Sequence, residues 1–260
     1  MRSGLRAIGR GVLTLLYEHR LQRTLDTTVA PHHVAMIIDG NRRWAKLLGE
    51  EAAVGHRAGA AKMLEFLDWC DDLGIGMVTL YLLSSDNLTS RNRDELEALF
   101  DIIGKLASDI STHREWRVKH VGSNVGLPER LIAALGAAEG RTTQKHGLHV
   151  NLAVGYGGRT EITDAMRSIV ASHHAEGRSL EDLAERLTPD LIGEHLYTGG
   201  QPDPDLVIRT SGEQRLSDFM LWQSAHSEFY FVEALGPDLR HIDFLRAIRD
   251  FGRRQRRFGG

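Results

Sequence analysis

Two kinds of hydrophobic pattern alternate along this chain of 260 residues, and the alternation constrains the fold more than any other feature. Short continuous apolar runs are typical of strands buried on both faces. Between these runs, apolar residues recur at helical spacing, and the first such segment ends at Gly74, a residue suited to a helix C-terminus. Strands alternating with helices predict an α/β fold with a mostly parallel central sheet covered on both faces. We assign strands to residues 34–38, 77–83, 148–154, 206–208 and 228–232, a weaker sixth to 117–121, and helices around 60–70, 96–106 and 162–170.

The length and composition indicate one large domain. A hydrophobic content of 42% is enough for a substantial core. The formal net charge of -3 argues against a surface that coats nucleic acid, so we expect no nucleic-acid partner. The single cysteine, Cys70, cannot form an internal disulfide, which is typical of a protein of the reducing cytoplasm.

The first 30 residues differ from the rest and are predicted to form an amphipathic helical segment, followed by a domain over residues 31–260. The apolar run at 11–17 is too short to span a bilayer, and Glu18 and Arg20 follow it at once. We favour packing of this helix on the domain, with peripheral contact with a membrane surface as the alternative.

Polar and charged side chains gather where the predicted strands end. In parallel sheets, ligands bind outside the carboxyl ends of the strands. Four strands are followed by the tracts DGNRRW, SSDN, GYGGR and RTSGEQRLS. These tracts offer the side chains of Asp39, Arg42, Arg43, Ser84, Asn87, Arg159, Arg209, Arg215 and Ser217.

This set of residues predicts an anion site, and a diphosphate is its natural ligand. The planar fork of arginine matches phosphate oxygens, and serine hydroxyls donate further hydrogen bonds. Asp39 would repel phosphates unless Mg²⁺ bridged them, as this ion does between carboxylates and substrate oxygens. Glu228 is a candidate for a second carboxylate.

Structural roles compete with these functional ones. Asp39 could cap a helix that starts near Asn41, and Arg42 and Arg43 could be solvated surface residues. GYGGR fits an ordinary turn into a helix, whereas RTSGEQRLS carries more charge than a turn requires. Other chemistries lack their motifs, since the chain has no P-loop, GxGxxG, HExxH or GxSxG tract. The paired histidines at 32–33 and 173–174 are interpreted as surface residues.

Together the tracts resemble the cis-prenyltransferases, the undecaprenyl diphosphate synthase-like family. The resemblance rests on HVAMIIDGNRRWAK, GHRAGA, LYLLSSDNL, NLAVGYGGRTEI and DPDLVIRTSGEQRLSDFMLWQSAHSEFYF, in that order from about His33 onwards. It implies a single catalytic domain with about six strands, flanking helices and an apolar tunnel for the growing chain. It also implies an Mg²⁺-dependent homodimer.

The resemblance assigns roles residue by residue. Asp39 would hold Mg²⁺ at an allylic diphosphate, and Glu228 would help to place a metal at isopentenyl diphosphate. Asn87 would take part in proton removal, although an amide is a poor base and could instead orient the departing pyrophosphate as proton acceptor. The implied substrate-binding residues are Gly40, Asn41, Arg42, Arg43, Trp44, His56, Ser84, Ser85, Asp86, Leu88, Arg209, Arg215, Leu216 and Ser217.

The implied reaction is ionisation of the allylic diphosphate, attack by isopentenyl diphosphate, and proton loss to give a Z double bond. Four positions depart from the usual family residues, namely Ala52, Asp86, Leu88 and Gln214. These departures concern how the allylic partner is held, because Asp39 and the arginines are retained.

Product length is predicted from Leu82, because long-chain family members tend to have a small residue at this place. A leucine would fill tunnel volume and stop extension early, as in the actinobacterial branch that makes Z,E-farnesyl diphosphate from geranyl diphosphate. Leu82 could also be ordinary core. The alternatives are a longer-chain enzyme, a lavandulyl-type synthase and a non-catalytic partner subunit. The basic tail at 253–260 is interpreted as solvated or disordered.

Overall fold

The computed structural model describes residues 18, 20–23, 25 and 29–258. The predicted N-terminal helix over residues 1–30 therefore lies mostly outside the described residues. Within the described part of the chain, no helix is both long and apolar enough to cross a membrane.

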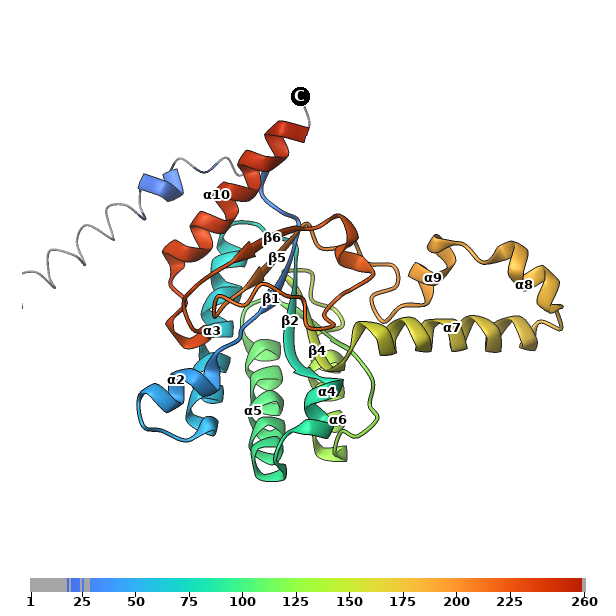
Figure 1. The fold of residues 1–260 in the computed structure, drawn as a ribbon, viewed down its shortest axis with the longest axis horizontal. Coiled ribbons are helices and arrows are strands. Elements are labelled where there is room, and N and C mark those ends of the chain that lie inside the picture. Colours follow the sequence, from blue (N-terminus) through green and yellow to red (C-terminus); the bar gives the residue numbers. More distant parts are fainter. Residues whose placement is uncertain (1–17, 19, 24, 26–28, 259–260) are drawn as a thin grey trace, which may run out of the picture.

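The central sheet has six strands that all run parallel, in the order β3-β4-β2-β1-β5-β6. All six predicted strands are confirmed, the weak candidate included. β1 lies between β2 and β5 (Figure 1), so the tracts that follow these three strands share one edge of the sheet. The strands are β1 (His33–Ile37), β2 (Met77–Ser84), β3 (Arg117–Val121), β4 (His149–Tyr156), β5 (Leu206–Arg209) and β6 (Glu228–Phe231).

Helices connect the strands from β1 to β5 as the alternating pattern predicts, whereas a loop with one 3₁₀ turn joins β5 to β6. Gly74 follows the first long helix with a φ of 74°, the left-handed conformation in which glycine is favoured. The α-helices are α2 (Asn41–Leu47), α3 (Ala52–Asp72), α4 (Ser85–Ser90), α5 (Arg93–Thr112), α6 (Glu129–Thr142), α7 (Gly158–Ala175), α8 (Leu180–Arg186), α9 (Pro189–His195) and α10 (His241–Phe258), and the short 3₁₀ turns are Gln223–His226 and Gly236–Asp238.

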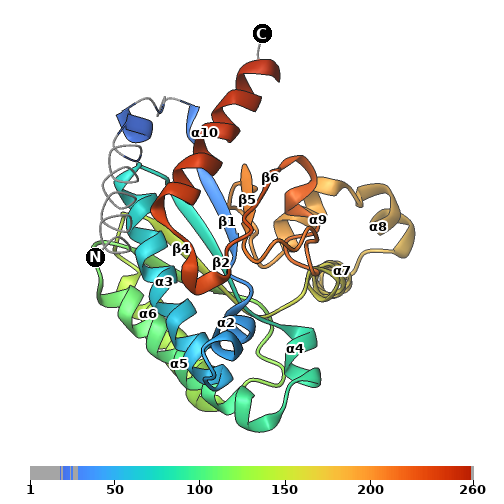
Figure 2. The same cartoon turned by 60° about the vertical axis from the view of Figure 1, so that its left-hand side comes forward.

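The main core lies on one face of the sheet, where α3, α5, α6 and α10 pack side by side (Figures 1 and 2). Phe66 of α3 contacts Phe244 of α10 edge to face, with 5.3 Å between the ring centroids. The opposite face is covered differently, since loop residues Phe219 and Met220 pack there on Tyr156 and its neighbours. This loop follows the tract RTSGEQRLS and therefore lies close to the predicted ligand edge.

Two segments differ from the expected arrangement. The helices α7, α8 and α9 form an arm that projects from the sheet (Figure 1). Over residues 253–258 the basic tail is helical, because α10 runs on to Phe258, while Arg253 and Arg254 are exposed as the solvated alternative predicts. Its strongly amphipathic sequence explains this, since one face of α10 packs into the core.

A buried polar network closes the amino edge of the sheet. It includes His33, so the interpretation of the paired histidines as surface residues is wrong at this position. His33 is 1% exposed and is not a surface residue, because it begins the buried strand β1. Its Nδ1–H donates to the Pro202 carbonyl at 2.9 Å, so its Nε2 accepts from the Thr79 hydroxyl at 2.8 Å. His173 is also buried, with Nε2 2.8 Å from the Ser179 carbonyl oxygen.

We predict that acid destabilises the fold through His33. Burial lowers the pKa of His33 from 6.5 to about 4, so the unfolded chain binds more protons below pH 6.5. The folded state, which holds His33 neutral, is therefore fully stable with respect to this residue above pH 6.5 and loses stability as the pH falls towards 4. The contribution of His33 to the free energy of unfolding should fall by about 2 kcal/mol between pH 7 and pH 5.

Denaturant unfolding at both pH values would test this prediction. His33→Gln should remove most of this pH-dependent loss, whereas His32→Gln, at the exposed neighbouring position, should retain it. An identical pH dependence in wild type and His33→Gln would contradict the prediction.

Candidate active site

A cavity of about 570 Å³ opens at the carboxyl ends of β1, β2 and β5. Most residues predicted from the strand-end tracts meet there, although their segments are far apart in the sequence. The predicted residues that line the cavity are Asp39, Gly40, Asn41, Arg42, Arg43, His56, Leu82, Ser84, Asp86, Asn87, Arg209, Arg215 and Ser217.

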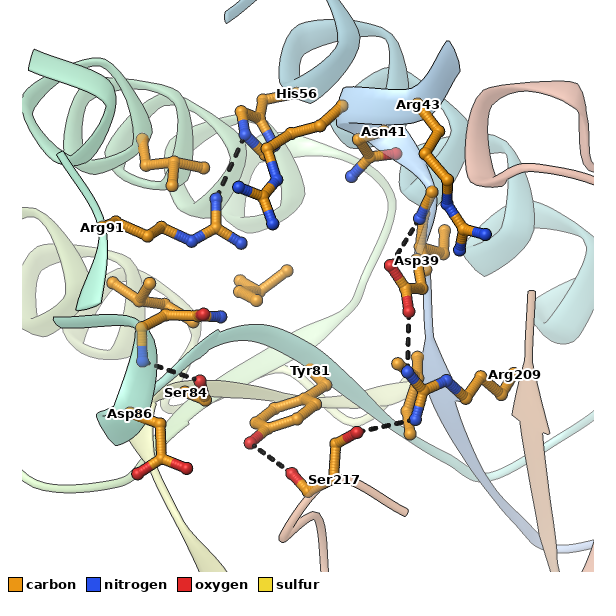
Figure 3. A pocket seen from close by; sticks show the side chains of 18 of the residues that line it. Asp39, Asn41, Arg43, His56, Tyr81, Ser84, Asp86, Arg91, Arg209 and Ser217 are labelled. Atoms are coloured by element: carbon orange, nitrogen blue, oxygen red, sulfur yellow. Dashed lines mark hydrogen bonds and ion pairs between the residues drawn. The ribbon is translucent and has the colours of Figure 1, made fainter. Parts of the chain in front are cut away.

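An ion pair between residues of neighbouring strands lies on one side of the cavity. Nη2 of Arg209 donates to Oδ2 of Asp39 at 2.7 Å, and Nη1 donates to Oγ of Ser217 at 2.8 Å (Figure 3). Arg209 is only 3% exposed, so its charge requires these partners. Burial opposes ionisation of Asp39, but Arg209 and the Gly40 N–H outweigh it and lower the pKa of this carboxyl.

The backbone around Asp39 is fixed by its neighbours. The Asp39 N–H donates to the Thr210 hydroxyl at 2.8 Å, and this hydroxyl lies 2.8 Å from the Asp39 carbonyl oxygen. Asp39 does not cap α2, because Gly40 occupies the cap position with a φ of 93°. The Asp39 carboxylate instead accepts from the Gly40 N–H and faces Arg209.

A second group of charged side chains lies on the other side of the cavity. Oε1 of Glu95 accepts from Nη1 of Arg91 at 2.5 Å and lies 3.0 Å from Nε2 of His56 and 4.0 Å from Nε of Arg42. Burial lowers the pKa of His56 although Glu95 opposes the shift, so His56 is predominantly neutral at pH 7. Figure 3 shows Arg91 and His56 on this side, across the cavity from Asp39.

A third ion-paired group joins the tracts DGNRRW and RTSGEQRLS at the cavity. Glu213 is 3.6 Å from Nη2 of Arg43 and accepts a hydrogen bond from Arg215. Arg43 and Arg215 are both at least half exposed, so their charges remain accessible to an anionic ligand. The cavity lining also includes the apolar side chains of Leu82, Leu83 and Leu99.

Six predicted site residues do not line the cavity. Trp44 turns away, and its indole N–H donates to Asp238 at 2.9 Å. Leu216 packs on the loop side of the sheet, and Leu88 packs against the main core. The six are Trp44, Ser85, Leu88, Arg159, Leu216 and Glu228.

Glu228 is the clearest correction. It is the first residue of β6 and pairs in register with Leu206, the first residue of β5. Arg209 ends β5, so Glu228 lies at the opposite end of the sheet from Asp39. Its carboxylate accepts from Nη1 of Arg254 at 2.5 Å. Within one chain, Glu228 therefore cannot share a metal ion with Asp39.

The remaining carboxylates fit an ion that arrives with its substrate. In the part of the chain that the structure describes, no three His, Cys, Asp or Glu side chains are grouped to hold a metal. Asp39 and Asp86 both line the cavity. Mg²⁺ is commonly bound by one or two carboxylates together with substrate phosphates and water. Asp39, which is ionised, is suited to this arrangement.

Several cavity residues were not found from the sequence. Tyr81 lies inside an apolar run that was interpreted only as a strand, and Arg91 lies three positions after Leu88, the last residue of the tract SSDNL. A strand's side chains alternate between faces, which is the signal that could have placed Tyr81. The further lining residues are Ile37, Ile38, Tyr81, Leu83, Arg91 and Leu99.

Comparison with known proteins decides the family. A family model described as putative undecaprenyl diphosphate synthase matches residues 37–259. The chain belongs to the cis-prenyltransferase family. This cis-prenyltransferase is 52% identical to isoprenyl transferase 1 of Streptomyces avermitilis over 250 residues, which cover 96% of this chain and 97% of that protein. It is 55% identical to the (2Z,6E)-farnesyl diphosphate synthase of Thermobifida fusca, over 94% of this chain and 96% of that protein.

The fold has a close match among solved structures. The crystal structure of lavandulyl diphosphate synthase from Lavandula x intermedia, in complex with dimethylallyl diphosphate, superposes with a TM-score of 0.80. The two proteins are 35% identical, and the match covers 86% of this chain and 96% of that one. The fold described above thus belongs to a known prenyltransferase architecture.

Asn41, the first residue of α2, is packed closely between two glycines. An added Cβ at Gly59 would lie 2.5 Å from Oδ1 of Asn41, and one at Gly236 would lie 2.7 Å from the same atom. The Asn41 side chain therefore fits only because Gly59 and Gly236 have no Cβ. Since it lines the cavity, its position is part of the site.

We predict that Gly59→Ala displaces the Asn41 side chain and weakens binding of inorganic pyrophosphate by about tenfold, the loss expected from one or two hydrogen bonds. Isothermal titration would measure this. The matched control is Gly136→Ala in α6, where an added Cβ meets nothing within 4 Å. The control should bind normally, and equal binding by both variants would contradict the prediction.

Proposed function

We propose that this protein is a short-chain Z-prenyl diphosphate synthase. It would condense isopentenyl diphosphate with an allylic diphosphate and release diphosphate. Geranyl diphosphate is the proposed starter and Z,E-farnesyl diphosphate the product. The observation that carries the proposal is one cavity that has arginines on two opposite sides and leucine side chains in its lining. Two diphosphates with hydrocarbon tails match this distribution of charge.

The allylic diphosphate is proposed to bind at the side formed by α2 and α3. Gly40, Asn41, Arg42 and Arg43 start or belong to α2, and His56 faces them from α3. Arg91, which also lines the cavity, joins this subsite. Ser84 and Asp86 belong to its border with β2 and α4.

Isopentenyl diphosphate is proposed to bind at the carboxyl end of β5. Arg209 already directs both Nη atoms into this region, towards Asp39 and Ser217. Arg215 is 63% exposed at the cavity and supplies the second cation. Bidentate arginine contacts and a serine hydroxyl are suited to phosphate oxygens. Ser85, Leu88, Leu216 and Trp44 would act at most indirectly, since they do not line the cavity.

The proposed reaction begins with cleavage of the C1–O bond of the allylic diphosphate. The electron pair leaves with diphosphate, whose charge the arginines stabilise. The isopentenyl double bond then forms the new carbon–carbon bond, and loss of one proton gives the Z double bond. Mg²⁺ held by Asp39 and substrate phosphates would neutralise part of the leaving-group charge. Leucine side chains of the cavity would exclude water from the cationic carbon.

Asn87 is proposed to assist proton removal. Its amide is too weak a base to take the proton at neutral pH, so it would orient a diphosphate oxygen as the acceptor. Asn87 lines the cavity, and its backbone N–H donates to the Ser84 side chain at 3.1 Å. This hydrogen bond caps α4 and holds both residues at the end of β2.

The short product is supported by Leu82 and by the relatives. Leu82 lines the cavity at the carboxyl end of β2, where a hydrocarbon tail would extend. The Thermobifida fusca relative named above is a (2Z,6E)-farnesyl diphosphate synthase. A lavandulyl-type activity is the second candidate, because the structure with a TM-score of 0.80 is a lavandulyl diphosphate synthase.

We further propose that residues 31–260 are the catalytic domain of a cytoplasmic homodimer, with peripheral membrane contact as an additional property of the N-terminal segment. The family resemblance supports the dimer. Light scattering on the purified protein should give about twice the mass of 29.0 kDa for one chain.

A product assay tests the proposed function. Purified protein is incubated with Mg²⁺, labelled isopentenyl diphosphate and dimethylallyl, geranyl or farnesyl diphosphate, and the dephosphorylated products are chromatographed. We expect one condensation on geranyl diphosphate. Joining of two dimethylallyl units would support the lavandulyl-type activity instead. Products of many units would support a long-chain enzyme, and no product from any starter would refute an enzymatic role.

The chain-length role of Leu82 gives a second prediction. Leu82→Ala should lengthen the products, because it removes volume from the wall beside the growing tail. The matched control is Leu80→Val, on the same strand but buried in the core and outside the cavity lining. It should lower the melting temperature without changing product length. Unchanged products in Leu82→Ala would contradict the role.

A further inference from the structure

The loop that carries Ser217 has an unusual backbone. Ser217, Asp218 and Met220 have φ values of 52°, 63° and 46°. This left-handed region is uncommon for residues other than glycine. Three such residues within four positions persist only where surrounding contacts determine the conformation. The contacts that hold this loop come from Tyr81 of β2 and from the start of α7.

Tyr81 makes the first of these contacts. It lies on β2, and its hydroxyl donates to the Ser217 carbonyl oxygen at 3.1 Å, as Figure 3 shows. Its ring also stacks on Phe219, with 4.4 Å between the centroids and 15° between the planes. Burial raises the pKa of Tyr81, so the hydroxyl remains protonated as a donor.

Asp218 makes the second set of contacts that hold the loop. Its carbonyl oxygen accepts from the Gly158 N–H at 2.7 Å, and its Oδ1 accepts from the Arg159 N–H at 3.1 Å. Both donors belong to the first turn of α7. An added Cβ at Gly157 would lie 2.7 Å from the Asp218 Oδ2, so the glycine permits this approach. The tract GYGGR, which the proposed reaction does not use directly, thus holds the loop from the side of β4.

These contacts act on Arg209 through the loop. Nη1 of Arg209 donates to the Ser217 hydroxyl at 2.8 Å and also to the Arg215 carbonyl oxygen. A change in the loop backbone would move the Ser217 hydroxyl and the Arg215 carbonyl together. Arg209 is buried, so loss of these acceptors would reorient its guanidinium group.

We infer that Tyr81 and Asp218 are positioning residues for the isopentenyl diphosphate subsite: they hold the left-handed loop 217–220 so that Ser217 and Arg209 are preorganised for the diphosphate. This inference rests on the proposed function. It gives Tyr81 and Asp218 no direct part in bond making. Asp218 does not line the cavity, so an effect of its substitution on substrate binding would come from positioning and not from lost contact with the substrate.

Steady-state kinetics of three variants test the inference. Tyr81→Phe removes the hydroxyl but keeps the stacked ring, and Asp218→Ala removes the acceptor for the Arg159 N–H. Both should raise KM for isopentenyl diphosphate by about tenfold, the scale of one well-placed hydrogen bond, and change KM for geranyl diphosphate by less than about twofold. Asp218→Asn retains an acceptor oxygen and should restore KM to near wild type.

The control is Tyr197→Phe, which loses a 2.6 Å hydrogen bond to Asp164 of α7 away from the cavity. Its KM for both substrates should not change. The inference is overturned if Tyr81→Phe and Asp218→Ala behave like this control, or if they raise both KM values equally.

A binding measurement separates this test from the proposed function. Titration with inorganic pyrophosphate in Mg²⁺ should show weaker binding in Tyr81→Phe and Asp218→Ala than in wild type and Asp218→Asn. Unaltered binding in both variants would refute the positioning role even if the wild type formed no product. Absence of product with the expected binding changes would instead refute the proposed reaction.

Discussion

The site depends on one ion pair between neighbouring strands. Arg209 is the last residue of β5 and pairs in register with Ile37 of β1, two residues before Asp39. The parallel arrangement therefore brings a cation and a carboxylate from tracts 170 residues apart to a distance of 2.7 Å. Because Arg209 is buried, removing Asp39 would leave its charge uncompensated, and removing Arg209 would leave the Asp39 carboxylate without its cation. The pair fixes the point at which the two proposed diphosphate subsites meet.

The other cations at the cavity are also held by carboxylates. Glu95 contacts Arg91, His56 and Arg42, and Glu213 contacts Arg43 and Arg215. This explains how a chain with a net charge of -3 can present a basic cavity, because the positive charge is local and ordered by its acidic neighbours. A diphosphate would compete with these carboxylates for the exposed arginines. Arg209 differs, since its partners are held by backbone contacts at Thr210 and in the loop 217–220.

Much of the fold and site follows from local patterns. Buried parallel strands have recognisable apolar runs, and their carboxyl ends share an edge, so Asp39, Arg209 and Ser217 could be placed together before the structure was known. Glu228 was misplaced although the predicted strand 228–232 begins with this acid, because the starting end of a parallel strand lies at the opposite edge of the sheet from the ligand site. Trp44 and His33 were misplaced for another reason, since hydrogen bonds to Asp238 and Pro202 determine their orientation across long sequence separations. The loop 217–220 depends on left-handed residues for which no sequence pattern was available.

The central claim is that this edge of the sheet binds two diphosphates in one cavity. A crystal structure of the protein with Mg²⁺, isopentenyl diphosphate and an unreactive thiolodiphosphate analogue of geranyl diphosphate tests it most directly. The account predicts one diphosphate at Asn41, Arg42 and Arg43, the second at Arg209, Arg215 and Ser217, and the geranyl tail beside Leu82. Diphosphates bound away from Asp39 and Arg209, or a hydrocarbon tail that leaves the cavity without passing Leu82, would contradict it.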